Sequence, residues 1–176
     1  MRRYILTGAP GSGKTALLRQ MEIDGYGVVE EAATDVIALE QAHGVVTPWA
    51  EPGFLDRVVQ LQRTRQLTAA THRVTFFDRS PVCTLALSRY AGIPAPAALQ
   101  AAVDRSSELY EPTVFLVRNQ GFVEPTAARR ISFEESLRFE RIHEETYRER
   151  GFTLIEVPAG PLGTRAAILR ETVDPR

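Results

Sequence analysis

Eight residues near the start of the sequence have the types and spacing that phosphate binding requires. They read Gly-Ala-Pro-Gly-Ser-Gly-Lys-Thr at positions 8–15, the pattern of a phosphate-binding loop (P-loop, or Walker A motif). Glycines let backbone N–H groups turn onto phosphate oxygens without an intervening Cβ atom. Lys14 can reach the β- and γ-phosphates, and the Thr15 hydroxyl can bind Mg²⁺. The residues expected to contact the nucleotide are Gly8, Ala9, Pro10, Gly11, Ser12, Gly13, Lys14, Thr15 and Ala16.

The segments on both sides of this loop fit the motif. Tyr4, Ile5 and Leu6 precede it as a short apolar run of β-prone residues, and residues 16–22 are strong helix formers. A P-loop requires this order of strand, loop and helix. The helix that starts near Gly13 would point the positive end of its dipole at the bound anion.

Asp78 and Arg79 follow a buried strand predicted for residues 74–77. An acidic residue at the carboxyl end of such a strand can hold Mg²⁺ or accept a proton from a substrate hydroxyl. We therefore predict a catalytic and metal-binding role for Asp78, and a substrate-binding role for Arg79. The structural alternatives are that Asp78 caps the helix starting at Pro81, and that Arg79 pairs with a surface carboxylate.

Two further acidic residues, Glu30 and Glu31, end the second predicted strand. Their position would bring them to the same crevice, where Glu31 could position a substrate hydroxyl. The alternative is that the two carboxylates are a solvated pair, or the first-turn acids of a helix.

Arginines are concentrated in an irregular segment, residues 118–131, that follows the fourth predicted strand. Arg118, Arg129 and Arg130 could close over the nucleotide as a lid and stabilise the charge of a transferring phosphoryl group. The alternative is a solvated basic loop balanced by Glu124, Glu134 and Glu135.

Strand and helix signals alternate along the whole chain. Five predicted strands separated by helical segments indicate an α/β fold, with a parallel sheet covered by helices on both faces. Ligands bind such sheets at the carboxyl ends of the strands. The predicted strands are residues 4–6, 28–29, 74–77, 113–117 and 152–157, and the predicted helices include 31–42, 81–90, 97–110, 132–150 and 162–172.

Length and composition bear on the number of domains, the partners and the cellular compartment of the protein. The chain has 176 residues, which favours one domain over residues 1–176, and its net charge of −1 predicts neither nucleic acid nor a membrane as a partner. The strand at the N-terminus leaves no room for a signal peptide, and Cys83 is the only cysteine, so we expect a cytoplasmic protein. The three histidines have no partners at metal-ligand spacing, and we interpret them as structural or solvated.

Taken together, these motifs resemble small P-loop ATPase and kinase-like domains of the AAA type, related to the nicotinamide-riboside-kinase domain and more distantly to nucleoside and nucleotide kinases. The resemblance implies ATP with Mg²⁺, an arginine lid, and a five-stranded sheet of order 2-3-1-4-5 in a three-layer P-loop NTPase fold. The matching segments, in order, are 8–15, 30–33, 78–80, the arginine segment and 147–158.

The chain departs from the pattern of its relatives on the acceptor side of the crevice. Thr34 stands where they often carry arginine, and Cys83 stands where they often carry a second aspartate. The identity of the acceptor is therefore not predicted. The sequence gives no prediction of the oligomeric state either. The absence of a guanine-reading Asn-Lys-x-Asp motif favours ATP over GTP as the nucleotide.

Two functions remain open at this point. One is an ATP-dependent phosphotransferase acting on a small, possibly nucleoside-like acceptor. The other is a nucleotide-dependent switch or ATPase that signals to a protein partner. A closed polar cavity beside Asp78 would favour the phosphotransferase, and a large exposed apolar patch would favour the switch.

Overall fold

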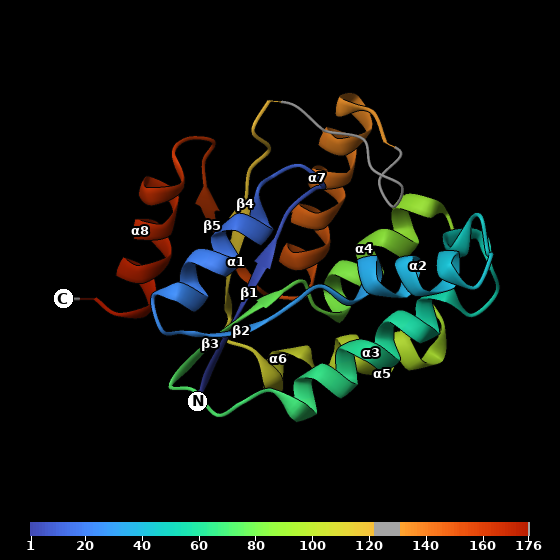
Figure 1. Ribbon diagram of the computed structural model, residues 1–176, viewed down its shortest axis with the longest axis horizontal. Helices are drawn as coiled ribbons and strands as arrows, with labels where there is room; N and C mark the ends of the chain where they lie inside the picture. The colour runs from blue at the N-terminus through green and yellow to red at the C-terminus, as the bar shows by residue number, and fades with distance from the viewer. Residues whose placement is uncertain (122–130, 176) are drawn as a thin grey trace.

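A five-stranded parallel sheet lies at the centre of the computed structural model, which describes residues 1–121 and 131–175 (Figure 1). The strand order is β2-β3-β1-β4-β5, which confirms the predicted order and fold class. The strands are β1 (Arg2–Thr7), β2 (Gly27–Val29), β3 (Val74–Asp78), β4 (Thr113–Val117) and β5 (Thr153–Val157).

The helices follow the predicted segments with one difference. Residues 97–110 form two helices instead of one, divided at Arg105. The hydroxyl of Ser106 donates to the carbonyl of Ala102 at this division, and such side-chain bonds compete with the regular helix ladder. The helices are α1 (Lys14–Ile23), α2 (Ala32–Ala42), the 3₁₀ turn η1 (Pro48–Ala50), α3 (Phe54–Thr68), α4 (Pro81–Ala91), α5 (Ala97–Asp104), α6 (Ser106–Leu109), α7 (Phe133–Glu149) and α8 (Leu162–Val173).

Local sequence signals explain where two of these helices begin. Ser132 and Glu135 form a capping box at the start of α7, in which each side chain accepts from the backbone N–H of the other residue. Ser80 caps α4 by accepting from the backbone N–H of Val82, and Pro81 occupies the first helical position. No helix in the described part of the chain is long and apolar enough to span a membrane.

Helices cover both faces of the sheet because side chains alternate along each strand. On β1, Tyr4 and Leu6 pack against α1 and α8, which lie side by side in Figure 1. Ile5 points to the opposite face, where α2, α3, α4 and α5 supply most of the packing. Both faces of the central strands are therefore buried, as in other parallel sheets.

The register of the strands brings the predicted site residues to one edge. Leu6 of β1 pairs with Asp78 of β3, and Val29 of β2 pairs with Phe77 of β3. The chain leaves β1 into the P-loop, and it leaves β2 at Glu30. Since all strands are parallel, these exits meet at the carboxyl edge of the sheet.

Phe76 lies at the centre of an aromatic cluster on the α1 and α8 face. Its ring centroid is 5.4 Å from that of Tyr26, 6.0 Å from Tyr4 and 6.1 Å from Phe115. We predict that Phe76→Ala lowers the free energy of unfolding by about 3–5 kcal/mol, because it removes a fully buried ring. Urea denaturation measures this loss.

Leu67→Ala is the matched control, since Leu67 is exposed on α3 and its truncation should change stability by less than about 0.5 kcal/mol. Equal losses in the two variants would show that this cluster does not hold α1 and α8 on the sheet.

Candidate active site

The P-loop turns between β1 and α1 through backbone conformations that require glycine. Gly8 has φ 134°, and a Cβ atom at this position would lie 2.3 Å from the carbonyl oxygen of Val117. Gly11 and Gly13 also have positive φ angles, of 83° and 82°. The loop therefore wraps tightly against the end of β4 before entering α1.

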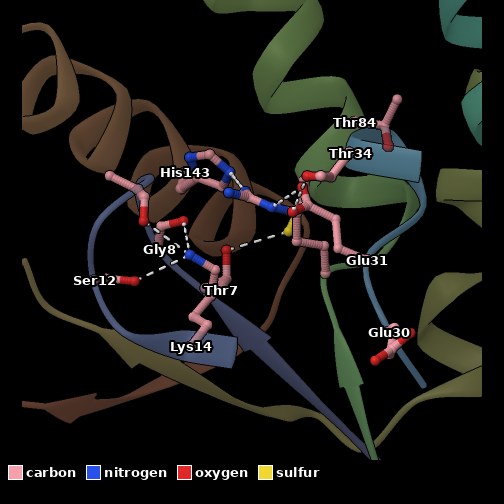
Figure 2. Close-up of polar contacts among 12 residues, drawn as sticks. Thr7, Gly8, Ser12, Lys14, Glu30, Glu31, Thr34, Thr84 and His143 are labelled. Carbon is pink, nitrogen blue, oxygen red and sulfur yellow. Dashed lines mark hydrogen bonds and ion pairs between the residues drawn. The ribbon is translucent and has the colours of Figure 1, made fainter. Parts of the chain in front are cut away.

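The side chain of Lys14 folds back into this loop. Its ammonium group donates to the carbonyl oxygens of Gly8 (2.9 Å) and Ala9 (2.8 Å) and to the hydroxyl of Ser12 (3.0 Å), as Figure 2 shows for the labelled residues. Burial is the main cause that lowers the pKa of Lys14 to about 8. The Lys14 ammonium group is therefore held in place by loop oxygens.

Thr15 and Ala16 follow Lys14 in the first turn of α1, and both are exposed. Their backbone N–H groups belong to the amino-terminal end of the helix, where such groups have no partner within the helix. The hydroxyl of Thr15 is thus accessible to a ligand at the mouth of the loop.

Asp78 is the last residue of β3 and is 6% exposed. Its Oδ1 atom is buried and has no hydrogen-bond partner among the described residues. Burial, which the charge of Lys14 only partly offsets, raises the pKa of Asp78 to about 6. Ser80 caps α4 in place of Asp78. The alternative prediction, in which Asp78 is only a helix cap, is therefore wrong.

Arg79 has a strained backbone. Its φ angle of 73° lies in the left-handed region, which non-glycine residues rarely adopt and which costs about 1–3 kcal/mol. Its Nε atom forms an ion pair with Oε1 of Glu31 at 2.6 Å, and its Nη1 atom lies 3.0 Å from Nε2 of His143. Residues with this kind of strain gather at functional sites, where the surrounding structure holds them.

Glu31 precedes α2 and completes this cluster of charges. Its Oε2 atom accepts a hydrogen bond from the Thr34 hydroxyl at 2.9 Å. Burial opposes its ionisation, but the charges of Arg79 and Lys14 prevail and hold the pKa of Glu31 below its ordinary value. Thr34, one of the two departures from the pattern of the relatives, therefore supports the Glu31 carboxylate.

His143 reaches the cluster from α7, a contact that the sequence did not predict. Its Nδ1 donates to the carbonyl of Phe139 (2.9 Å), which leaves Nε2 to accept from Arg79. Burial and the adjacent Arg79 charge lower the pKa of His143 well below its ordinary value, so its ring is neutral. The sequence signal that could have predicted this buried position is the four-residue spacing of Phe139, His143 and Tyr147, which places all three on one face of α7.

Tyr147, one turn further along α7, contacts residues directly after Arg79. Its hydroxyl lies 2.6 Å from the Ser80 hydroxyl and 3.0 Å from the sulfur of Cys83. The Cys83 sulfur also lies 3.3 Å from the hydroxyl of Thr7. Cys83, the second departure from the pattern of the relatives, is thus buried beneath the site and linked to α7.

A small pocket opens beside Asp78, between β3 and α3. It encloses about 10 Å³, close to the space of one water molecule. Its lining includes the apolar residues Val29 and Phe77 and the polar residues Glu30, Gln62, Gln66, Asp78, Arg79 and Tyr110. Asp78 at the end of β3 and Arg79 after it therefore share one small pocket with residues of α3.

Arg118 lies directly after β4 and is held by three carboxylates. Its guanidinium contacts Glu140 (3.1 Å) and Glu144 (2.9 Å) of α7, and Glu156 (2.6 Å) of β5. Arg129 and Arg130 lie outside the described residues. The arginine lid over residues 118–131 therefore stays a prediction.

The amino-acid sequence also matches a known family. The sequence model of a family described as an AAA domain matches residues 3–165. No curated protein matches the sequence significantly.

Solved structures share the fold over nearly the whole chain. The deoxyadenosine kinase from M. mycoides, with dCMP and dCDP bound, has a TM-score of 0.64 at 15% identity. The match covers 98% of this chain and 98% of that kinase. The shikimate kinase from Acinetobacter baumannii, in complex with shikimate, has a TM-score of 0.57 at 16% identity, over 98% of this chain and 93% of its own.

A third structure, the NadR protein in complex with NAD and AMP-PNP, has a TM-score of 0.66 at 14% identity. The match covers 97% of this chain and 48% of that protein. At these identities the likeness shows the fold, which is that of P-loop kinases.

The raised pKa of Asp78 yields a prediction about stability. The pKa is about 6 in the folded protein against 3.8 in a model peptide, so the folded state binds more protons between these values and loses stability as the pH rises through them. We predict that Asp78→Asn stabilises the protein by about 1–3 kcal/mol at pH 7.5 and has little effect at pH 4.5. Urea unfolding at both pH values measures the difference.

Glu145→Gln in the interior of α7 is the control, since Glu145 is exposed and its replacement should change stability by less than about 0.5 kcal/mol at both pH values. A uniform loss of stability in Asp78→Asn at both pH values would contradict the assignment of a costly buried charge.

Proposed function

This chain belongs to the AAA-domain family, and from that premise we propose that it is an ATP-dependent phosphotransferase acting on a hydroxyl group of a small, nucleoside-like acceptor. The observation that carries the proposal is the Asp78 carboxylate. It is buried beside Lys14 at the carboxyl edge of the sheet, keeps one oxygen without a partner in the described residues, and lines a small pocket.

The phosphate side of the site rests on the P-loop. Lys14 would exchange its contacts with the Gly8 and Ala9 carbonyls for the β- and γ-phosphate oxygens, where its charge is stabilised by anions instead of dipoles. The N–H groups of Thr15 and Ala16 would bind the phosphates at the amino-terminal end of α1.

Magnesium fits this site only together with the nucleotide. The described residues contain no group of three or more carboxylate, histidine or cysteine side chains that could hold a metal by themselves. Mg²⁺ is commonly bound by one or two protein oxygens plus substrate phosphates. The exposed Thr15 hydroxyl and the unpartnered Oδ1 of Asp78 are the oxygens that would hold it here.

The acceptor side would use Asp78 and the Glu31–Arg79 pair. In the transfer, the acceptor oxygen forms a bond to the γ-phosphorus, the bond from that phosphorus to the ADP oxygen breaks, and the acceptor hydroxyl loses its proton. Asp78 would accept this proton, since it is the carboxylate beside Lys14 at the carboxyl edge of the sheet. Arg79 would orient the acceptor oxygen, held by Glu31 and His143.

The lid arginines are part of the proposal. Arg118 would have to leave its three carboxylates in order to reach a phosphoryl group, whereas Arg129 and Arg130 are the further candidates in the same segment. Of the two functions considered, the unpartnered Asp78 oxygen in the described part of the chain and the Glu31–Arg79 pair beside it favour a phosphotransferase over a switch.

A direct test measures ADP formation from Mg-ATP, and separately GDP from Mg-GTP, across nucleosides, nucleotides and sugars. We expect ATP turnover to rise with one class of hydroxylated acceptor, and ³¹P NMR to detect its phosphorylated product. Turnover that is the same with every compound, with inorganic phosphate as the only product, would instead assign the chain to nucleotide-dependent switches.

We predict that Lys14→Ala abolishes ATP binding at micromolar nucleotide and leaves the fold intact. The lost cation serves the phosphates and contributes little to the apolar core. A thermal-shift titration with Mg-ATP measures binding, with Arg19→Ala, an exposed residue of α1, as the control. The same ATP-induced stabilisation in Lys14→Ala and wild type would refute the P-loop assignment.

Asp78→Asn should lower kcat by a factor of about 100 or more and change the ATP affinity by less than about threefold. The reason is that the carboxylate acts on the metal and the acceptor, while ATP binding rests on the P-loop. Steady-state kinetics with the activating acceptor provide the readout. Full turnover with weakened ATP binding is the opposite pattern, and it would remove Asp78 from the chemistry.

A further inference from the structure

Arg165 of α8 packs against the P-loop from outside the predicted site. It is 4% exposed, and its Nη2 atom donates to the carbonyl oxygen of Ser12 at 2.7 Å. A longer contact of 3.4 Å joins the same atom to the carbonyl oxygen of Arg118. The guanidinium thus bridges the phosphate-binding loop and the segment that leaves β4.

The fit between Arg165 and the loop is close. A Cβ atom at Gly13 would lie 2.9 Å from Nη1 of Arg165. Gly13 is favoured by its positive φ angle, and the guanidinium of Arg165 packs directly against it. The position of Arg165 fixes the two residues that precede Lys14.

The charge of Arg165 has no counter-charge among the described residues. Its hydrogen-bond acceptors are neutral, namely backbone carbonyls and the amide oxygen of Gln120, whereas Arg79 and Arg118 are each paired with carboxylates. Burial lowers the pKa of the Arg165 guanidinium. A buried cation without an anion is destabilising, and the positive end of the α8 dipole next to it adds to the cost.

Three sources of positive charge therefore meet at the P-loop: Lys14, Arg165 and the amino-terminal end of α1. A polyanion bound in the loop would compensate all three. We infer that Arg165 is a positioning residue of the nucleotide site, which holds Ser12 and Gly13 in the phosphate-binding conformation and gains its counter-charge when a nucleoside triphosphate binds. This inference rests on the proposed nucleotide binding.

Two consequences separate this role from a purely structural one. The loss of affinity on neutralising Arg165 should grow with the charge of the ligand, from AMP through ADP to ATP. The nucleotide-free protein should keep its fold, since the substitution removes a buried charge that nothing in the described protein compensates.

The test is calorimetric titration of Arg165→Gln, Arg165→Met and Arg165→Lys with AMP, ADP and Mg-ATP. Both neutral variants should weaken ATP binding by about tenfold or more, ADP binding by less and AMP binding least. Arg165→Lys keeps the charge and should recover most of the ATP affinity. Arg170→Gln is the control, since Arg170 lies on the same helix but pairs with Asp24.

The outcomes that overturn the inference are distinct from failure of the proposed function. An unchanged ATP affinity in the neutral variants, or equal losses for all three nucleotides, would remove Arg165 from the site. Unfolding of both neutral variants without nucleotide would assign Arg165 to the structural core and also overturn it. Wild-type protein that binds no ATP would instead refute the proposed function.

Discussion

The site depends on four ionisable side chains at the carboxyl edge of the sheet, two of them buried (Lys14 and Asp78) and two half-buried (Glu31 and Arg79). Lys14, Glu31, Asp78 and Arg79 come from three separate exits of the chain, and each influences the ionisation of the others. Burial disfavours every one of these charges, so two cations and two anions have to be placed within reach of one another. This balance constrains β1, β2 and β3 to end side by side.

The surrounding structure keeps this cluster in a conformation that it would not adopt alone. Arg79 stays in the left-handed region because its side chain is held by Glu31 on one side and by neutral His143 on the other. Lys14 is stabilised by loop carbonyls in place of phosphates. In the function proposed here, an anionic ligand would meet a cation that is already in place, and the Asp78 oxygen that has no partner among the described residues would be left for the metal.

How much the sequence predicts depends on whether a feature is local. The P-loop and the capping box before α7 were predictable, because their spacing along the chain encodes their geometry. The strand order came from the resemblance to kinase-like domains. The contacts of His143 and Arg165 join segments more than sixty residues apart, and no local pattern marks them. Arg118 was predicted from its position, but its three carboxylates belong to α7 and β5.

On ATP binding, we propose, the buried Lys14 ammonium exchanges loop carbonyls for phosphate oxygens. Its pKa of about 8 should rise when a triphosphate approaches, so binding at pH 8 should take up protons. Calorimetric titration of Mg-ATP at pH 8, in two buffers of different ionisation enthalpy, counts those protons. We expect the uptake of a fraction of a proton for each ATP that binds. Tight binding of ATP without any proton uptake would contradict it.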